Sequence, residues 1–236
     1  MVQVCLNGRR GATDGACVPL SPQALAESAA EAVAAGATEV HVHPRTPCGQ
    51  DSLSPRVVAA TVDAIRARVP VPVGVTTGAW TAPDPATRLD RVRGWSVLPD
   101  FASVNWHEPG AEELVEQLIT MGVGVEAGIW SGTDGAARFA ASPLGPEVLR
   151  VLAEVTDPDP DTAEATARAL LAELDGAFGR PVLLHGEEGG TWPVLRLAGR
   201  LGLATRTGLE DTLFLPDGQR AFSNAQLVAE ALRPGP

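Results

Sequence analysis

Lysine and tyrosine are absent from this sequence, and each absence excludes a class of chemistry. Every one of the 18 basic residues is arginine. Without lysine the chain cannot form a Schiff base, anchor pyridoxal phosphate or place a lysine in a phosphate-binding loop. Without tyrosine it has no phenolic acid or base. Enzyme classes that depend on these groups are therefore excluded.

Cysteine is scarce, and long apolar runs are missing. The three cysteines, Cys5, Cys17 and Cys48, show no Cys-x-x-Cys spacing, which is typical of reduced thiols in a cytoplasmic protein. For Cys48 a loop thiol is the simpler interpretation, and a redox or metal role is the alternative. No charged leader precedes an apolar segment, and no apolar run approaches the roughly 18 residues that a membrane helix needs. We expect a cytoplasmic protein with no membrane partner.

Basic residues are outnumbered by acidic ones. The 29 acidic and 18 basic residues give a formal net charge of −11, whereas nucleic acids and anionic membranes bind basic surfaces. We expect no nucleic-acid partner, and an anionic ligand must meet local arginines. The 236 residues, 44% of them hydrophobic, suffice for one globular domain with a sizeable core.

Short apolar runs alternate about eight times with Ala- and Leu-rich segments of helical period. Alternating strands and helices build parallel sheets, and eight such units close into a barrel. The sequence therefore predicts an α/β fold, a (β/α)8 TIM barrel in a single domain over residues 1–236, with an open doubly wound sheet as the alternative. The expected strands are Gln3–Asn7, Glu39–His43, Val71–Thr76, Phe101–Asn105, Gly124–Ile129, Val148–Val155, Pro181–His185 and Ala204–Thr207. The expected helices are Pro22–Ala35, Pro55–Arg68, Pro85–Arg93, Ala111–Met121, Gly135–Ala141, Asp161–Phe178, Thr191–Leu201 and Asn224–Leu232.

The ends of several expected helices carry their own signals. Ser21-Pro22 and Ser54-Pro55 each place a capping serine before a first-turn proline. The Pro- and Asp-rich stretch 157–161 is interpreted as the opening of the sixth helix rather than as a domain linker. Three glycines are expected to end helices at their C-termini: Gly36, Gly122 and Gly202.

Two of the four histidines, His41 and His43, end a short apolar run. Residues two apart on a strand point to the same face, so the two imidazoles converge. A His-x-His pair suits Zn²⁺, which takes three protein ligands in a typical catalytic site. Glu210 or His185 could supply the third ligand. The alternative is a pair of hydrogen-bonded strand histidines.

Polar residues gather where the expected strands end, and in a TIM barrel those ends form the active site. Buried ionisable groups are costly unless they are paired or bind a metal, so this ring favours a polar site. Trp80 and Trp106 also fall at strand ends, where they could wall a pocket. In chain order the polar residues are Asn7, Arg9, Arg10, His41, His43, Arg45, Thr76, Thr77, Asn105, His107, Glu126, Glu154, His185, Glu187, Arg206, Glu210 and Asp211.

Two short motifs in this ring have a chemical interpretation. The paired carboxylates Glu210 and Asp211 can divide the roles of metal ligand and general base, or they can simply begin a helix. Arg206 can keep Asp211 ionised, or it forms a surface ion pair of little energetic value. The turn Thr76-Thr77-Gly78 offers two hydroxyls and free backbone N–H groups that suit a carboxylate or phosphate, or it is a turn without a ligand.

Taken together, these stretches resemble the β-keto acid cleavage enzymes, typified by 3-keto-5-aminohexanoate cleavage enzyme. The resemblance implies a Zn²⁺-dependent barrel that exchanges the acyl part of a β-keto acid with acetyl-CoA, giving acetoacetate and a new acyl-CoA. It also implies a homo-oligomer. The similar stretches are Val4–Gly8, Ser21–Arg45, Thr76-Thr77-Gly78, Ala102–Asn105, Arg206–Asp211 and Ser223–Gln226.

The resemblance also assigns roles to individual residues. His41, His43 and Glu210 match the family's zinc ligands. Asp211 matches its base, assisted by Arg206, while Thr76 or Thr77, Asn105 and Glu126 match substrate-contacting positions.

One departure concerns the turn Asn7-Gly8-Arg9-Arg10. Members that act on the amino-bearing keto acid carry an acidic residue there. Arg9 and Arg10 fit better with a carboxylate or with the phosphates of CoA, although a solvated turn without a ligand is the alternative.

Two further functions compete with this interpretation. One is another metal-dependent barrel enzyme, a lyase or a hydrolase, although such hydrolases usually add histidines on later strands and a lysine. The other is a non-catalytic barrel that retains a remnant of the site. Metal analysis separates the latter from the enzymes.

Overall fold

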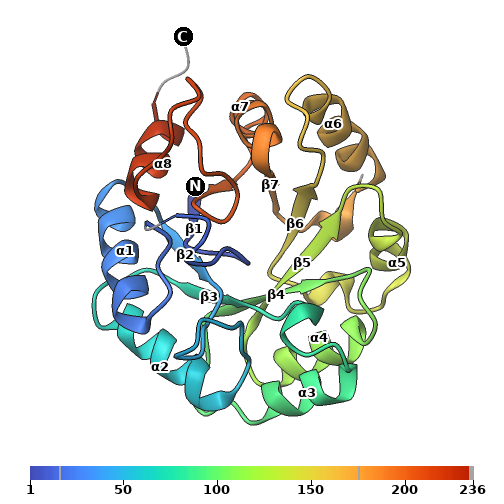
Figure 1. Cartoon of the computed structure of the whole chain (residues 1–236). Helices are drawn as coiled ribbons and strands as arrows, with labels where there is room; N and C mark the ends of the chain where they lie inside the picture. The colour runs from blue at the N-terminus through green and yellow to red at the C-terminus, as the bar shows by residue number, and fades with distance from the viewer. Residues whose placement is uncertain (16, 175, 234–236) are drawn as a thin grey trace.

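A computed structural model describes residues 1–15, 17–174 and 176–233, and in this part of the chain eight parallel strands form one sheet. The strand order is β7-β6-β5-β4-β3-β2-β1-β8, and a bridge between Leu183 and Ala204 joins β7 to β8. The helices surround this ring of strands (Figure 1), which confirms the (β/α)8 TIM barrel. The strands are β1 Val2–Cys5, β2 Glu39–Val42, β3 Val73–Thr76, β4 Phe101–Asn105, β5 Gly124–Trp130, β6 Arg150–Val155, β7 Val182–Gly186 and β8 Thr205–Thr207. The helices are α1 Pro22–Ala34, α2 Pro55–Arg66, α3 Pro85–Arg93, α4 Ala111–Thr120, α5 Gly135–Ala141, α6 Ala163–Glu173, α7 Thr191–Leu201 and α8 Asn224–Ala231.

The apolar core lies between the sheet and the helices. On α2, Val58, Val62 and Ile65 are fully buried, and their spacing of four and three residues places them on one face of the helix. Strand residues that point outward, such as Val40 and Val42, belong to the same buried cluster. In the described ranges no helix combines the length and apolar character needed to cross a membrane.

Most helix ends follow the expected signals. Ser21 accepts a hydrogen bond from the N–H of Ala24, and Gly36, Gly122 and Gly202 all have positive φ. The expectation for Ser54 is wrong, because its side chain makes no capping hydrogen bond. The proline at the first helical position, which fixes φ, begins α2 instead.

The sixth helix is shorter than the predicted Asp161–Phe178. The carboxylate of Asp157 accepts hydrogen bonds from the hydroxyls of Thr162 and Thr166, 2.8 Å each, so the stretch 157–161 leads into α6 without belonging to it. Beyond Glu173, Gly176 takes a left-handed conformation with φ 78° and a separate 3₁₀ turn follows, which ends the helical path. The predicted helix also includes Asp175, which lies outside the described residues.

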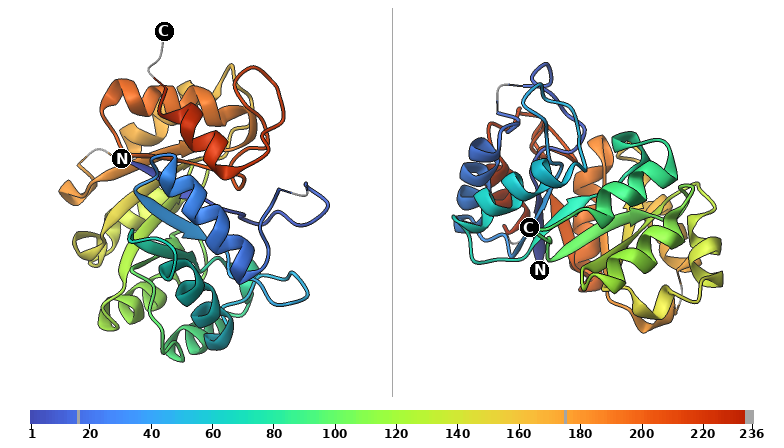
Figure 2. Two further views of the ribbon diagram at one scale, coloured as in Figure 1. Left: turned by 90° about the vertical axis from the view of Figure 1, so that its left-hand side faces the viewer. Right: turned by 90° about the horizontal axis from the view of Figure 1, so that it is seen from below.

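Charged side chains fill the barrel interior at two levels. At the amino ends of the strands, Arg150 donates from Nε to Glu126 (2.7 Å) and from Nη1 to Glu39 (3.2 Å). Gln3 donates to the same Glu126 oxygen over 2.9 Å. We call Gln3, Glu39, Glu126 and Arg150 the floor network. The opposite end, from which the loops after β1 and β2 extend (Figure 2), holds the polar residues described next.

Candidate active site at the carboxyl ends of the strands

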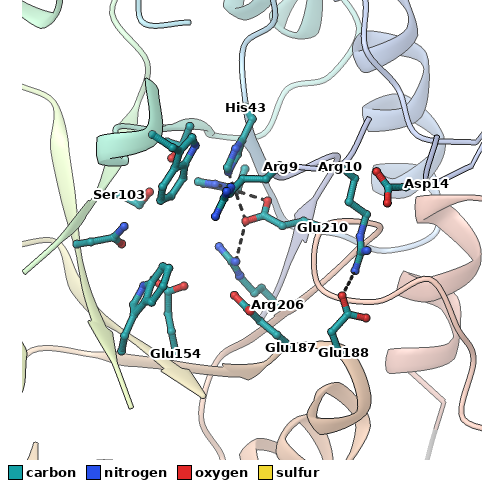
Figure 3. Close-up of a pocket in the computed structure, with 15 residues that line it drawn as sticks. Arg9, Arg10, Asp14, His43, Ser103, Glu154, Glu187, Glu188, Arg206 and Glu210 are labelled. Atoms are coloured by element: carbon teal, nitrogen blue, oxygen red, sulfur yellow. Dashed lines mark hydrogen bonds and ion pairs between the residues drawn. The ribbon is translucent and has the colours of Figure 1, made fainter. Parts of the chain in front are cut away.

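A cavity of about 420 Å³ opens at the carboxyl ends of the strands. Side chains from β2, β4, β6, β8 and the loops that follow them point into it (Figure 3). This is the end at which TIM barrels place their active sites. Its lining residues are Arg9, Arg10, Asp14, His41, His43, Thr76, Trp80, Ser103, Asn105, Trp130, Glu154, Glu187, Glu188, Arg206 and Glu210.

His41, His43 and Glu210 meet in this cavity. Nε2 of His41 lies 3.8 Å from one carboxylate oxygen of Glu210, and Nε2 of His43 lies 3.4 Å from the other. One ligand atom from each of the three side chains lies within 4.8 Å of the other two. The two histidines face the same way because they are two apart along β2, and the loop after β8 brings Glu210 to them. The structure therefore joins Glu210, and not His185, to the histidine pair.

Neighbouring groups hold the histidine pair in place. The Asn7 side-chain amide donates to the carbonyl of His43 (2.9 Å) and accepts from its N–H (3.0 Å). Nδ1 of His43 lies 3.6 Å from Asp51, whose carboxylate also meets Arg45 at 3.1 Å. The ring of Trp80 stacks on His43 at 5.7 Å. A carboxylate behind a histidine is the usual support of a metal-binding imidazole.

Burial and neighbouring charges shift the pKa values of these three side chains in different directions. Burial lowers the pKa of His41 to about 4, so this imidazole is neutral at pH 7. The pKa of His43 is raised, because Glu210 and Asp51 outweigh the opposing effect of burial. The carboxylate of Glu210 keeps a pKa well below its usual range, because Arg206 and the two histidines outweigh its burial. A neutral imidazole and an ionised carboxylate are the forms that bind a metal.

Asp211 lies next to this group and is fully buried. Its Oδ1 lies 3.1 Å from an Arg206 nitrogen and 3.5 Å from Nδ1 of His185. The same Arg206 nitrogen donates to Glu210 over 3.0 Å. Among the described residues, Oδ2 of Asp211 has no hydrogen-bond partner. The geometry thus provides a buried carboxylate, flanked by two cationic groups, with one free oxygen.

Four of the predicted substrate-contacting residues line the cavity and two do not. Thr76 and Asn105 face it, as do Arg9 and Arg10. The Thr77 hydroxyl instead donates to the carbonyl of Ser103 over 2.6 Å, because the residue after Thr76 points to the other face of the strand. Glu126 belongs to the floor network, which favours a structural role for it.

The two arginines of the first loop differ in their partners. Arg10 donates to the carbonyl of Leu209 (2.6 Å) and to Glu188 (2.7 Å). The guanidinium of Arg9 lies over Trp80, 5.4 Å from the ring centre, and the residue is exposed. In the described residues Arg9 forms no ion pair. Arg9 is therefore the arginine free to meet a ligand.

The two remaining histidines and Trp106 lie in different surroundings. His185 is fully buried between Asp211 and Glu154, whereas His107 packs beside Trp130 and does not line the cavity. The expectation that Trp106 walls a pocket is wrong. It packs in the core against Phe139 with ring centres 5.0 Å apart, because its side chain leaves the strand on the helix-facing side.

Sequence reasoning missed several lining residues. Ser103 precedes Asn105 by two positions on β4, so alternation along the strand was a signal for it. Asp14, Trp130 and Glu188 come from loops or a strand end, and no local pattern marks them. Glu187 was noted without a role. Burial and the neighbouring Glu154 raise its pKa to about 7.

Comparison with known proteins gives one family and a set of barrels. The family model of the beta-keto acid cleavage enzymes (BKACE) matches residues 1–123 and 148–234. None of the curated proteins gives a match. The ternary complex of ObcA with a C4-CoA adduct and oxalate is similar at 18% identity and a TM-score of 0.67, covering 90% of this chain and 62% of its own. The binary complex of ObcA with oxaloacetate is similar at 17% identity and a TM-score of 0.66, and the match covers 90% of this chain and 62% of ObcA.

A type I 3-dehydroquinate dehydratase from Clostridium difficile is also similar. Its identity is 11% and its TM-score 0.61, with 96% of this chain and 90% of its own covered. At such identities these structures share the barrel fold. The chain spans about three fifths of the length of ObcA, as the 62% coverage states.

Proposed function

The chain belongs to the β-keto acid cleavage enzyme family, and we propose that it is a zinc-dependent member that condenses a β-keto acid with acetyl-CoA. The products are acetoacetate and a new acyl-CoA. The observation that carries this proposal is the convergence of His41, His43 and Glu210 beside the buried carboxylate of Asp211.

The three ligand side chains fit a zinc ion. Ligand atoms that bind Zn²⁺ at 2.0–2.1 Å in tetrahedral geometry lie about 3.4 Å apart. Nε2 of His43 lies 3.4 Å from Oε1 of Glu210, and Nε2 of His41 lies 3.8 Å from Oε2. Oε2 of Glu210 has no hydrogen-bond partner in the described ranges, so it is free to bind a cation. When bound, the metal supplies a Lewis acid that polarises the β-keto acid.

Asp211 then acts as the general base. Its free oxygen accepts a proton from the methylene between the keto and carboxylate groups, and the resulting carbanion attacks the thioester carbonyl of acetyl-CoA. The CoA thiolate that leaves attacks the keto carbon of the adduct that comes from the substrate, and the bond between that carbon and the former methylene carbon breaks. This gives the new acyl-CoA and the carbanion of acetoacetate, which takes the proton back from Asp211. Arg206, 3.1 Å from Oδ1 of Asp211, orients this carboxylate. None of these steps needs a lysine.

The remaining lining residues support a small anionic substrate and a CoA thioester. Thr76 and Asn105 offer neutral polar groups inside the cavity, and Arg9 offers a free guanidinium at its edge. ObcA, a barrel with 18% identity, has been crystallised with oxaloacetate and with a C4-CoA adduct. The fold therefore has a precedent for both kinds of ligand.

A panel of β-keto acids assayed with acetyl-CoA tests the proposal. The zinc-loaded protein should form acetoacetate and a new acyl-CoA from at least one member, and both products should disappear when a chelator removes the metal. Metal-dependent products without acetyl-CoA consumption, or no activity on any member, would contradict it. Sedimentation velocity of the same preparation tests the homo-oligomer that we propose with it.

A further inference from the structure

The loop after β1 packs directly against two of the metal-binding residues. We call residues 8–14, which include both cavity arginines, the arginine loop. Asn7, just before it, brackets the backbone of His43 with hydrogen bonds of 2.9 and 3.0 Å. At Gly8 φ is +51°, and a Cβ there would collide with the side chain of Glu210. Glycine lets the backbone of the loop lie this close to a metal ligand.

Arg45 ties the arginine loop to the strand that carries the histidine pair. It follows His43 by two positions and is only 7% exposed. Its Nη2 donates to the carbonyl of Gly8 and, over 3.0 Å, to the carbonyl of Arg10. Its Nη1 donates to the carbonyl of Gly49 over 2.9 Å. One buried guanidinium, with donors fixed in a plane, thus holds the loops after β1 and β2 together.

Asp51 joins this guanidinium to the metal-binding imidazole. Its Oδ1 lies 3.1 Å from Nε of Arg45 and 3.6 Å from Nδ1 of His43. The other ring nitrogen of His43, Nε2, faces Glu210. When Nε2 binds a metal, a carboxylate behind Nδ1 fixes the orientation of the ring. Contacts therefore run without a break from the metal-binding nitrogen through Asp51 and Arg45 to the backbone of the arginine loop.

Trp80 makes a second connection between the same two parts. Its ring stacks on His43 with centres 5.7 Å apart, and the guanidinium of Arg9 lies over it at 5.4 Å. A cation over an indole ring is attracted to it. The arginine loop is thus connected to His43 through its backbone and through the side chain of Arg9.

We infer that Arg45 is a positioning residue that couples zinc binding at His43 to the order of the arginine loop. Zinc should hold the cavity arginines in place, and a loosened loop should weaken zinc binding, because coupling between two sites is reciprocal. The coupling rests on the proposed function for the identity of the metal. Arg45 is not among the residues that line the cavity, so it acts through Asp51 and the loop backbone.

Amide hydrogen exchange of the whole chain, with zinc and after its removal by a chelator, tests the coupling. The reporters are the N–H groups of Arg10, Gly11 and Asp14, which donate to the Asn7 carbonyl (3.1 Å), the Asp14 carboxylate (2.7 Å) and the Gly11 carbonyl (3.0 Å). Zinc should slow their exchange by about fivefold or more. The loop of residues 131–135 follows β5, opposite β1 in the barrel, and should not respond.

Two variants interrupt the contacts at different points. Arg45→Lys keeps the charge but cannot reproduce the planar set of donors, and Asp51→Asn removes the charge between Arg45 and His43. Each should abolish the response of the arginine loop to zinc and lower zinc affinity by about tenfold or more, measured by competition with a chelator. Arg56→Lys, at an exposed position on α2, is the matched control and should behave as the wild type.

The response to zinc distinguishes coupling from a merely structural role. If Arg45 only held the loop, Arg45→Lys would speed exchange equally with and without zinc, and the inference would fail. Equal exchange in the zinc-loaded and zinc-free wild type would overturn the coupling while leaving the reaction intact. A zinc response in a wild type that forms no product would overturn the reaction but support the coupling. If Arg45→Lys does not fold, the wild type and Asp51→Asn decide.

Discussion

Both ends of the barrel axis hold buried ion pairs, but among the described residues far more buried nitrogen and oxygen atoms lack a hydrogen-bond partner at the cavity end than at the floor. In the floor network Arg150 contacts Glu126 and Glu39, and Gln3 adds a further donor. Of these side chains only Glu126 keeps one oxygen without a partner among the described residues. At the cavity end, unpartnered nitrogen and oxygen atoms belong to ten side chains: His41, His43, Arg45, Asp51, Trp80, Trp130, His185, Arg206, Glu210 and Asp211.

This difference indicates that the charges of the floor network are structural and those at the cavity end are functional. A buried ion pair with its hydrogen bonds made stabilises one arrangement of the barrel but leaves nothing to bind a ligand. Unpaired buried groups cost stability, and they persist where function requires them. Mutations in the floor network should therefore lower stability more than activity, and mutations at the cavity end should lower activity more than stability.

The largest effect is expected at the histidine pair. His41→Ala and His43→Ala should each reduce bound zinc from one ion per chain to almost none and abolish activity, because two protein ligands hold zinc poorly. The fold should persist, since the two histidine side chains are not part of the floor network. Metal analysis and circular dichroism measure both. His107→Ala is the control and should keep its metal; full metal content in both test variants would refute the ligand assignment.

Asp211→Asn should lose turnover while keeping zinc. An amide cannot accept the methylene proton, and removing a general base typically costs about 10²–10⁴-fold. Steady-state kinetics with parallel metal analysis measures this, and Asp217→Asn on the exposed loop before α8 is the matched control. Turnover within about threefold of wild type would remove Asp211 from the mechanism.

Arg150→Met tests the floor. It leaves Glu126 and Glu39 without their cation, and breaking a buried pair costs about 3–5 kcal/mol in the free energy of unfolding. Denaturant unfolding should detect this loss, whereas kcat/KM should change little because the floor lies away from the cavity. Arg93→Met removes an exposed pair with Asp90 and should barely alter stability. A variant that is stable but inactive would reverse the contrast drawn here.

His185 should make the free energy of unfolding decrease as the pH rises into the alkaline range. Its folded pKa, about 9, exceeds the ordinary value near 6.5, because the neighbouring carboxylates outweigh its burial and Arg206. The protonated ring therefore stabilises the fold fully below about pH 6.5, and this contribution is lost as the pH rises through about 9. One titrating proton changes the free energy of unfolding by at most about 1.4 kcal/mol per pH unit. His185→Gln should remove this contribution to the slope. Urea unfolding from pH 7 to 9.5 measures the slopes; identical slopes for the two proteins would contradict the expectation.

The smallest effect concerns the two loop arginines. Arg9→Gln should raise KM for acetyl-CoA or for the keto acid by about three- to tenfold, and added salt should weaken binding less than in the wild type. Arg10→Gln should have the smaller effect on salt dependence, because Glu188 already neutralises that guanidinium. Unchanged KM values and equal salt dependence in the Arg9 variant would return Arg9 to the solvated surface.

Some residues of the candidate site could be predicted from their near neighbours in the sequence, and others could not. His41 and His43 were found because alternation on one strand fixes their common face. Glu126 and Gly128 also share a face of β5, but they lie at different depths along the barrel axis. Depth depends on strand register, which no local pattern reveals. This is why Glu126 was expected at the cavity and belongs to the floor network instead.

The sequence by itself determined the eight alternating units, the helix ends at Gly36, Gly122 and Gly202, and the chemistry of the His-x-His strand, because each depends on neighbours within a few residues. Only the tertiary structure decided which groups meet. Glu210 reaches histidines more than 160 positions earlier, Arg10 is neutralised by Glu188, and Gly128 makes room for Glu154. These contacts follow from closure and register of the whole barrel, which bring together groups that share no segment of the chain.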